Sequence, residues 1–126
     1  MKEVVNTAGA PQAIGPYSQA IKTGGFLFLS GQIPVDPVSG DLAYGGIAVQ
    51  THQVFANIKA ILAAENLTLN DIVKCTVFLT DMNDFQVVNE AYGQYFKENP
   101  PARSCVQVAK LPKNVNIEIE AIAAYP

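Results

Sequence analysis

The sequence predicts an α+β domain in which two helices cover one face of a β-sheet. Apolar residues recur every three or four positions over 47–65 and 82–97, which is the spacing of an amphipathic helix. Short stretches rich in β-branched and apolar residues precede, separate and follow these helices, at 17–22, 26–30, 72–79, 102–108 and 115–124. This order of strands and helices favours a sheet with its helices on one face.

Turn and loop residues separate these elements. Thr23-Gly24-Gly25 joins the first two strands as a hairpin, and Asn66 is suited to cap the first helix at its C-terminus. Asn99-Pro100-Pro101 ends the second helix, because proline cannot continue it. With 126 residues, a mass of 13.5 kDa and no repeat or long linker, we expect one domain over residues 1–126.

The last two strands are expected to form a hairpin through the loop at 111–114. This pairing sets Cys105 opposite Glu118 and Arg103 opposite Glu120, with the register fixed to within about two residues. One face of the sheet would then gather a guanidinium, a thiol and two carboxylates.

Composition and charge exclude several functions. Eight Lys and Arg against eleven Asp and Glu give a net charge of −3, and no basic run occurs, so nucleic acid is not an expected partner. No apolar stretch approaches the roughly 20 residues that span a bilayer. The first residues lack the apolar segment of a secretory signal. Two cysteines without such a signal are expected to be reduced, which predicts a cytoplasmic protein.

The charged fraction is low for a small protein. Charged residues make up 15% of the chain, against about 25% in typical soluble domains. Two interpretations remain open, since the surface is either rich in uncharged polar residues or partly buried against other subunits.

Arg103 is the only arginine, beside seven lysines. Its planar guanidinium can bind a carboxylate through two parallel hydrogen bonds, which the ammonium of lysine cannot do. On the expected sheet face, a glutamate whose pKa is raised by burial could act as a general base toward water. This combination favours a site for a small anionic substrate. The structural alternative is an ion pair between Arg103 and a glutamate, or a solvated surface charge.

Other chemistries have weaker support in the residues. His52, the only histidine, and the cysteines Cys75 and Cys105 lack the spacing of a zinc site, so no metal is expected. A nucleophilic pair of Cys105 and His52 is an alternative without a supporting pattern. The glycines form no phosphate-binding motif, and no cofactor is expected.

Three sets of residues carry a resemblance to a known family. The first is Ala13-Ile14-Gly15-Pro16-Tyr17-Ser18-Gln19-Ala20, and the second is Ser30-Gly31-Gln32-Ile33-Pro34. The third combines Pro101-Ala102-Arg103-Ser104-Cys105-Val106 with Ile117-Glu118-Ile119-Glu120-Ala121. On these motifs, and over residues 8–123, the chain resembles the Rid/YjgF family. Within that family it resembles the RidA group of 2-iminobutanoate/2-iminopropanoate deaminases.

The resemblance implies a fold like that of the Bacillus-type chorismate mutase, with a mixed β-sheet, assembled as a homotrimer. Sheets would line the centre, helices would face outward, and a cleft would lie between each pair of neighbouring subunits. The implied reaction is hydrolysis of a 2-imino acid, or its enamine tautomer, to the 2-keto acid and ammonia without a cofactor. Such imines leave pyridoxal-phosphate-dependent dehydratases that act on threonine or serine.

The resemblance also implies roles for individual residues. Arg103 would hold the substrate carboxylate, and Glu118 would activate the attacking water and return a proton to the leaving ammonia. Further positions match residues that line the family's substrate pocket: Tyr17, Ser30, Gly31, Asn89 and Cys105. The expected hairpin selects Glu120 as the partner of Arg103, whereas the family signature selects Glu118. Glu120 is therefore interpreted as structural.

Two other classes of function remain as alternatives. The cleft could hold a small keto or imino acid without turnover, which would make the chain a regulatory binding protein. Ribonuclease or translation-inhibitor activity is described for some members of the family. The acidic charge and the single arginine argue against such an activity here.

Overall fold

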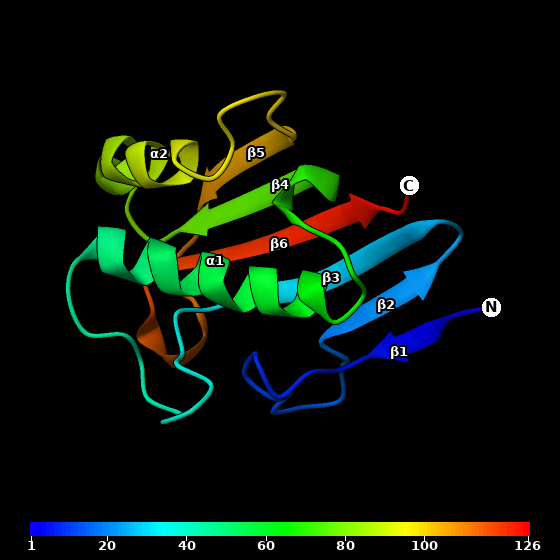
Figure 1. The fold of residues 1–126 in the computed structure, drawn as a ribbon. Helices are drawn as coiled ribbons and strands as arrows, with labels where there is room; N and C mark the ends of the chain where they lie inside the picture. Colours follow the sequence, from blue (N-terminus) through cyan, green and yellow to red (C-terminus); the bar gives the residue numbers. More distant parts are fainter.

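The computed structural model describes residues 1–126 as a six-stranded sheet with two α-helices on one of its faces (Figure 1). The strands are β1 (Glu3–Val5), β2 (Ala20–Thr23), β3 (Phe26–Gln32), β4 (Ile72–Leu79), β5 (Ala102–Gln107) and β6 (Ile117–Ala124). The α-helices are α1 (Ile47–Ala63) and α2 (Phe85–Gly93), and the 3-10 turns are η1 (Leu69–Asp71), η2 (Met82–Asp84) and η3 (Pro112–Asn114). The expected α+β class, with both helices on one face, is confirmed.

The core lies between the helices and the face of the sheet that they cover. Val54, Ile58 and Ile61 of α1 are fully buried, in one apolar cluster with sheet residues such as Val77 and Ile119. Their spacing along α1 matches the periodicity that predicts this helix. Burying each such side chain contributes about 1.5–3 kcal/mol, so this layer holds the sheet against the helices.

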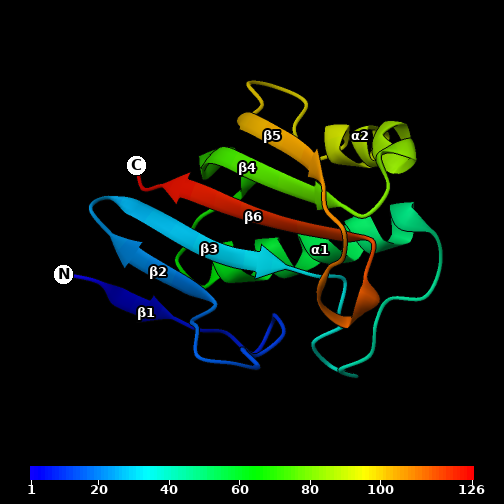
Figure 2. The ribbon, with the colours of Figure 1, turned by 180° about the vertical axis from the view of Figure 1, so that it is seen from behind.

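The other face of the sheet is left uncovered by the chain (Figure 2). Phe26 and Phe28 of β3 are each 42% exposed, and Val106 of β5 is 44% exposed. All three alternate with inward-facing residues of their strands, so they point to the uncovered side. We call this side the open face, and it is partly apolar.

The expected hairpin between the last two strands is wrong. The sheet order is β1-β2-β3-β6-β4-β5, so β6 lies between β3 and β4 and is not paired with β5. β5 is instead an edge strand that pairs in parallel with β4, with Arg103 beside Cys75. The cause is α2, which returns the chain so that β5 starts at the same end of the sheet as β4 (Figure 1).

This topology separates residues that the hairpin would have gathered on one face. Arg103 shares its face with Cys75, which is buried in the core beneath the helices. Glu118 pairs with Phe78 on β4, and the next residue of that strand, Leu79, is buried in the core. Glu118 therefore lies on the open face, and Arg103 lies on the helix-covered face at the edge of the sheet.

Smaller differences lie at the ends of elements. The strand expected at 17–22 begins only at Ala20, and the short strand β1 is not predicted by the sequence pattern. α1 ends at Ala63 with Ala64 as its cap, whereas Asn66 lies two residues further on in a left-handed conformation. The helix expected over 82–97 is a 3-10 turn followed by the shorter α2. None of the helices is both long and apolar enough to cross a membrane.

Candidate active site

Arg103 lies at the edge of the sheet with its guanidinium held by residues of α2. Its Nη1 donates a hydrogen bond to Oδ1 of Asn89 at 2.7 Å. The centre of the guanidinium lies 4.8 Å from the ring centroid of Tyr92 and 5.6 Å from that of Phe85. Both distances are within the range of a cation–π interaction. The guanidinium is thus fixed in position on two sides.

No carboxylate of the chain neutralises Arg103. The single ion pair of the chain joins Lys22 and Glu65, whose Nζ and Oε1 atoms are 3.4 Å apart. Within one chain, the structural alternative of an Arg103–glutamate ion pair is therefore wrong. A guanidinium has five N–H donors, and only one is used by the Asn89 amide. Its remaining donors can bind a carboxylate that comes from outside the chain.

The positioning of Arg103 follows from the periodicity of α2. Phe85, Asn89 and Tyr92 stand at positions i, i+4 and i+7, so they share one helical face. The 3-10 turn η2 leads into this helix, and its Asp81 side chain accepts a hydrogen bond from the amide of Asn83 at 2.9 Å. That cap fixes the start of η2, which continues directly into α2 at Phe85.

Tyr92 forms the buried floor beneath Arg103. Its ring packs edge-on against Phe55 and at a tilt against Phe96, with ring centroids 5.6 and 4.7 Å apart. Its hydroxyl is buried beside the Cys75 thiol and has no other hydrogen-bond partner. Burial raises the pKa of the Tyr92 hydroxyl and of the Cys75 thiol. Both groups are therefore neutral at physiological pH and leave the positive charge of Arg103 intact.

Glu118 lies on the open face, directly over the backbone of Gly31. A side chain at position 31 would collide with the Glu118 carboxylate, so only glycine allows this close approach. Burial raises the pKa of Glu118, and the negative charge of nearby Glu120 raises it further. A carboxylate with a raised pKa is a stronger base, as required to remove a proton from water.

A bulge in β3 places Ser30 and Gly31 beside the loop that carries Tyr17. The register between β3 and β6 shifts between Leu29 and Gln32. Ser30 Oγ donates to the carbonyl oxygen of Ser18 at 2.6 Å, which ties the bulge to that loop. Tyr17 is half exposed and lines a pocket together with Gly31. The Tyr17 hydroxyl accepts a hydrogen bond from the amide of Ile14 at 3.4 Å.

Cys105 lies two residues after Arg103 on the same face of β5. Burial raises the pKa of its thiol, while the charge of Arg103 acts in the opposite direction. No hydrogen bond joins Cys105 to the sole histidine, and Nδ1 of His52 is instead hydrogen-bonded to the Tyr95 hydroxyl at 2.6 Å. The alternative of a nucleophilic Cys–His pair is therefore wrong. No three His, Cys, Asp or Glu side chains converge on a point where a metal could bind.

Comparison with known proteins identifies the family. Residues 7–125 match the family model described as Endoribonuclease L-PSP. A RutC family protein of Pyrococcus horikoshii is 60% identical over 123 residues, which are 98% of this chain and 98% of that protein. The human 2-iminobutanoate/2-iminopropanoate deaminase is 51% identical over 123 residues, which are 98% of this chain and 90% of that protein. This chain belongs to the Rid/YjgF family.

A solved structure from the same family agrees with the fold. The crystal structure of Escherichia coli TdcF with bound serine matches this Rid protein with a TM-score of 0.94 and 47% identity. The match covers 98% of this chain and 99% of that one. The arrangement of strands and helices is therefore that of a known Rid protein.

The predicted site residues of this Rid protein fall into two groups in one chain. The Arg103 half-site consists of Arg103, Asn89 and Cys105, and it lies on the helix-covered side at the edge of the sheet. The Glu118 half-site is built around the β3 bulge and consists of Glu118, Gly31, Ser30 and Tyr17. The structure brings the members of each half-site together, but it does not bring the two half-sites together.

Two residues around Arg103 are missed by the sequence reasoning. Phe85 and Tyr92 are predicted only as apolar residues of the second helix, yet their rings flank the guanidinium. Their spacing from Asn89 is the signal that could have found them. Residues four before and three after a substrate-binding position share its helical face.

Proposed function

We propose that this Rid protein hydrolyses small 2-imino acids, and their enamine tautomers, to 2-keto acids and ammonia. The observation that carries the proposal is the guanidinium of Arg103, which is fixed by Asn89 and Tyr92 but unpaired with any carboxylate. Such a guanidinium suits the carboxylate of a 2-imino acid. The name of the human relative, a 2-iminobutanoate/2-iminopropanoate deaminase at 51% identity, supports the same reaction.

The reaction needs few protein groups, because the substrate already contains the C=N bond. Arg103 binds the carboxylate and orients the imine carbon. Glu118 accepts a proton from water as the water oxygen bonds to that carbon, which gives a carbinolamine. Glu118 then returns the proton to nitrogen. Glu118 next carries the hydroxyl proton of the carbinolamine to nitrogen, the C–N bond breaks as the C=O bond forms, and ammonia leaves.

A complete site requires two subunits in this account. Arg103 and Glu118 lie on opposite faces of the sheet, so one chain does not present both to one small substrate. In a homotrimer, the β5 edge of one subunit meets the open face of its neighbour and joins the Arg103 half-site to the Glu118 half-site. The exposed Phe26, Phe28 and Val106 support this assembly, because they give the open face apolar area to bury.

The remaining residues of the half-sites serve binding. The bulge sets the main chain of Gly31 next to Glu118, where it can bond the reacting end of the substrate, whereas the amide of Ser30 is already bound to the carbonyl oxygen of Gln19. Cys105 adds its main chain beside the carboxylate bound by Arg103. Asn89 fixes the guanidinium, and Tyr17 covers the bulge.

A coupled assay tests this function. A threonine dehydratase generates 2-iminobutanoate in place, and its loss is followed with the wild type, with Arg103→Ala and with Lys97→Ala. Lys97 is exposed and outside both half-sites, so this control removes a positive charge without touching the site. We expect acceleration by the wild type and the control, and a loss of about a hundredfold or more in kcat/KM for Arg103→Ala.

The same assay separates the competing functions. Binding of 2-oxobutanoate to the wild type without any acceleration of imine loss would overturn the deaminase and favour a regulatory binding protein. Cleavage of RNA that is lost in Arg103→Ala would favour the ribonuclease activity that the name of the family model suggests.

A further inference from the structure

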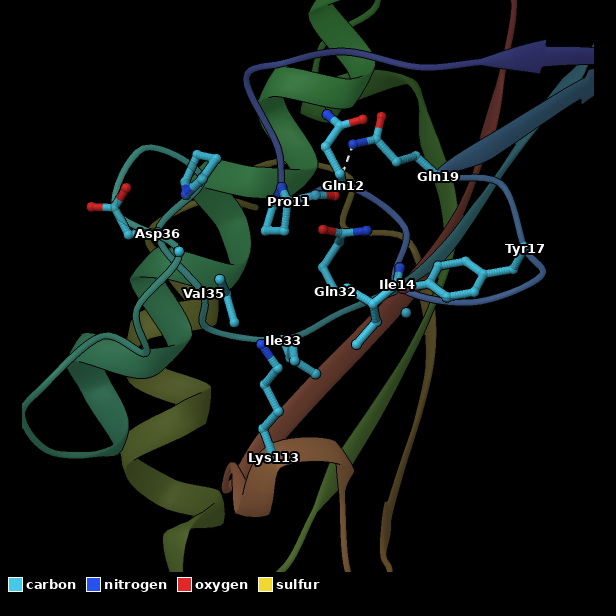
Figure 3. A pocket seen from close by; sticks show the side chains of 13 residues that line it. Pro11, Gln12, Ile14, Tyr17, Gln19, Gln32, Ile33, Val35, Asp36 and Lys113 are labelled. Atoms are coloured by element: carbon cyan, nitrogen blue, oxygen red, sulfur yellow. Dashed lines mark hydrogen bonds between the residues drawn. The ribbon is translucent and has the colours of Figure 1, made fainter.

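A pocket of about 280 Å³ opens beside the Glu118 half-site and is not used by the proposed reaction (Figure 3). It lies between the loop of residues 11–17 and the segment of residues 31–40. Gly31 and Tyr17 line it, so it adjoins two residues assigned to the substrate. The remaining wall combines apolar residues, among them Ile14, Ile33 and Val35, with the charged residues Asp36 and Lys113 at its rim.

Buried amide side chains fix both walls of this pocket. On one wall, Gln19 is 2% exposed, and its Nε2 donates to the carbonyl oxygen of Pro11 at 2.8 Å. On the other wall, Nδ2 of the fully buried Asn57 donates to the carbonyl oxygens of Ile33 and Val35, at 3.1 and 3.0 Å. The pocket is therefore preformed and does not depend on a ligand for its shape.

Gln32 differs from these two amides in one respect. The oxygens of Gln19 and Asn57 both accept hydrogen bonds, from the amide of Thr7 at 2.7 Å and from Gln53 Nε2 at 3.0 Å. Gln32 is only 5% exposed, and its Nε2 donates to the carbonyl oxygen of Ser30 at 3.3 Å. That bond identifies the nitrogen and leaves Oε1 of Gln32 as an acceptor without a partner.

The free oxygen of Gln32 is reached from the pocket. The Tyr92 hydroxyl is the only side-chain oxygen or nitrogen of the chain that is fully buried and has no hydrogen-bond partner. The unpartnered oxygen of Gln32 therefore keeps contact with the pocket. Figure 3 shows the Gln32 amide projecting into the space between the two loops. A buried acceptor that faces a preformed cavity is paired with water or with a hydrogen-bond donor of a ligand.

We propose that this pocket is the subsite for the substrate's side chain, and that Gln32 Oε1 selects 2-imino acids whose side chain ends in a hydrogen-bond donor. The inference rests on the proposed function. Gln32 pairs with the core residue Ile119 and so faces the helix-covered side, opposite Glu118. β2 pairs with β3 only as far as Leu29, so a substrate held at Gly31 can reach the Gln32 amide around this unpaired end of β3. The apolar residues of the pocket contact the body of the substrate's side chain. The amide oxygen of Gln32 accepts a hydrogen bond from the donor at its end.

Two imines that differ by one hydroxyl test the proposal. An L-amino acid oxidase converts tyrosine or phenylalanine into its 2-imino acid in place, and semicarbazide traps the imine that remains. The wild type is expected to hydrolyse the tyrosine-derived imine with a kcat/KM about three to ten times that for the phenylalanine-derived imine. The dehydratase-derived 2-iminobutanoate serves as a short reference substrate.

The variant Gln32→Met keeps the length of the side chain and removes the acceptor. We expect the ratio of the two kcat/KM values to fall to about one, because only the hydroxyl-bearing imine loses a bond. The ratio does not depend on the fraction of folded protein, so partial misfolding does not imitate the result. The control Gln94→Met makes the same exchange at an exposed position on the far end of α2 and is expected to keep the wild-type ratio.

The outcomes distinguish failure of the side-chain subsite from failure of the imine deaminase activity. Equal rates for both aromatic imines in the wild type, or no hydrolysis of either while 2-iminobutanoate is hydrolysed, would overturn the subsite and leave the deaminase standing. A wild-type ratio that survives Gln32→Met would also overturn it.

A binding measurement covers the case in which no imine is hydrolysed. Calorimetry with 4-hydroxyphenylpyruvate and phenylpyruvate then supports the subsite if the first binds more tightly and Gln32→Met removes the difference. Equal binding of the two keto acids would show that the pocket holds only water.

Discussion

Glu118 and Glu120 are two residues apart on β6, and the charge of Glu120 contributes to the raised pKa of Glu118. The proposed reaction needs Glu118 as a carboxylate, so kcat/KM falls as the pH drops through its pKa. Glu120→Gln removes the neighbouring charge, lowers the pKa of Glu118 and should move this acid limb to lower pH. A pH profile of kcat/KM on 2-iminobutanoate checks this shift. Glu98→Gln, at an exposed position in the loop before β5, should leave the limb in place. An acid limb that does not move in Glu120→Gln would mean that another group controls it.

Individual residues were partly predictable from the sequence. The scarcity of arginine points to Arg103, and the resemblance to the family selects Glu118 over Glu120. The sequence does not show why residue 31 is a glycine. The reason is that the Glu118 carboxylate, on a different strand, comes too close to leave room for a side chain there. The unpaired oxygen of Gln32 was equally hidden, since hydrogen-bond partners depend on how loops fold over one another.

At the scale of elements, α2 and β5 act as one unit that presents Arg103. Tyr92→Phe removes a buried hydroxyl that lies beside the Cys75 thiol and has no other hydrogen-bond partner, so the free energy of unfolding should change by less than about 1 kcal/mol. Tyr92→Ala removes the ring from the Phe55–Phe96 cluster and should cost about 3–5 kcal/mol. Denaturant unfolding at one fixed protein concentration measures both changes. A large loss of stability in Tyr92→Phe would show that the hydroxyl–thiol contact matters more than the ring.

The elements themselves were predictable, but their pairing was not. Periodicity located both helices and five of the six strands to within a few residues. The hairpin was wrong because neighbouring strands in a sequence often pair with each other, and the pattern of residues 102–107 fits either an edge or a hairpin. The succession of β4, α2 and β5 indicates the correct pairing, because a helix between two strands favours their parallel pairing.

At the scale of the whole molecule, the open face is the feature that one chain leaves unexplained. Phe28 is 42% exposed there, and Phe28→Glu should leave the fold intact but prevent the proposed assembly. We expect monomers by light scattering, an unchanged circular dichroism spectrum and loss of imine hydrolysis. Val38→Glu changes a 95% exposed residue in the loop after β3 and should remain assembled and active. A Phe28→Glu protein that assembles and works normally would contradict the role of the open face.

The low fraction of charged residues is consistent with an apolar open face but does not distinguish between the two interpretations of that fraction. Uncharged polar residues or burial between subunits explain 15% charged residues equally well. The fold shows where the exposed apolar residues lie, since Phe26, Phe28 and Val106 share one side of the sheet. The separation of Arg103 from Glu118 could not be predicted either, because it depends on the order of strands in the sheet.

Mixing two inactive variants is the most direct test of the central claim that each site combines Arg103 of one subunit with Glu118 of another. Arg103→Ala and Glu118→Gln are each expected to be inactive in the imine assay. After unfolding and refolding together in equal amounts, random trimers should place both intact groups at about a quarter of their interfaces. We therefore predict that activity returns to about a quarter of the wild-type value. Activity that stays at the level of the separate variants, in mixed trimers verified by mass spectrometry, would contradict the account.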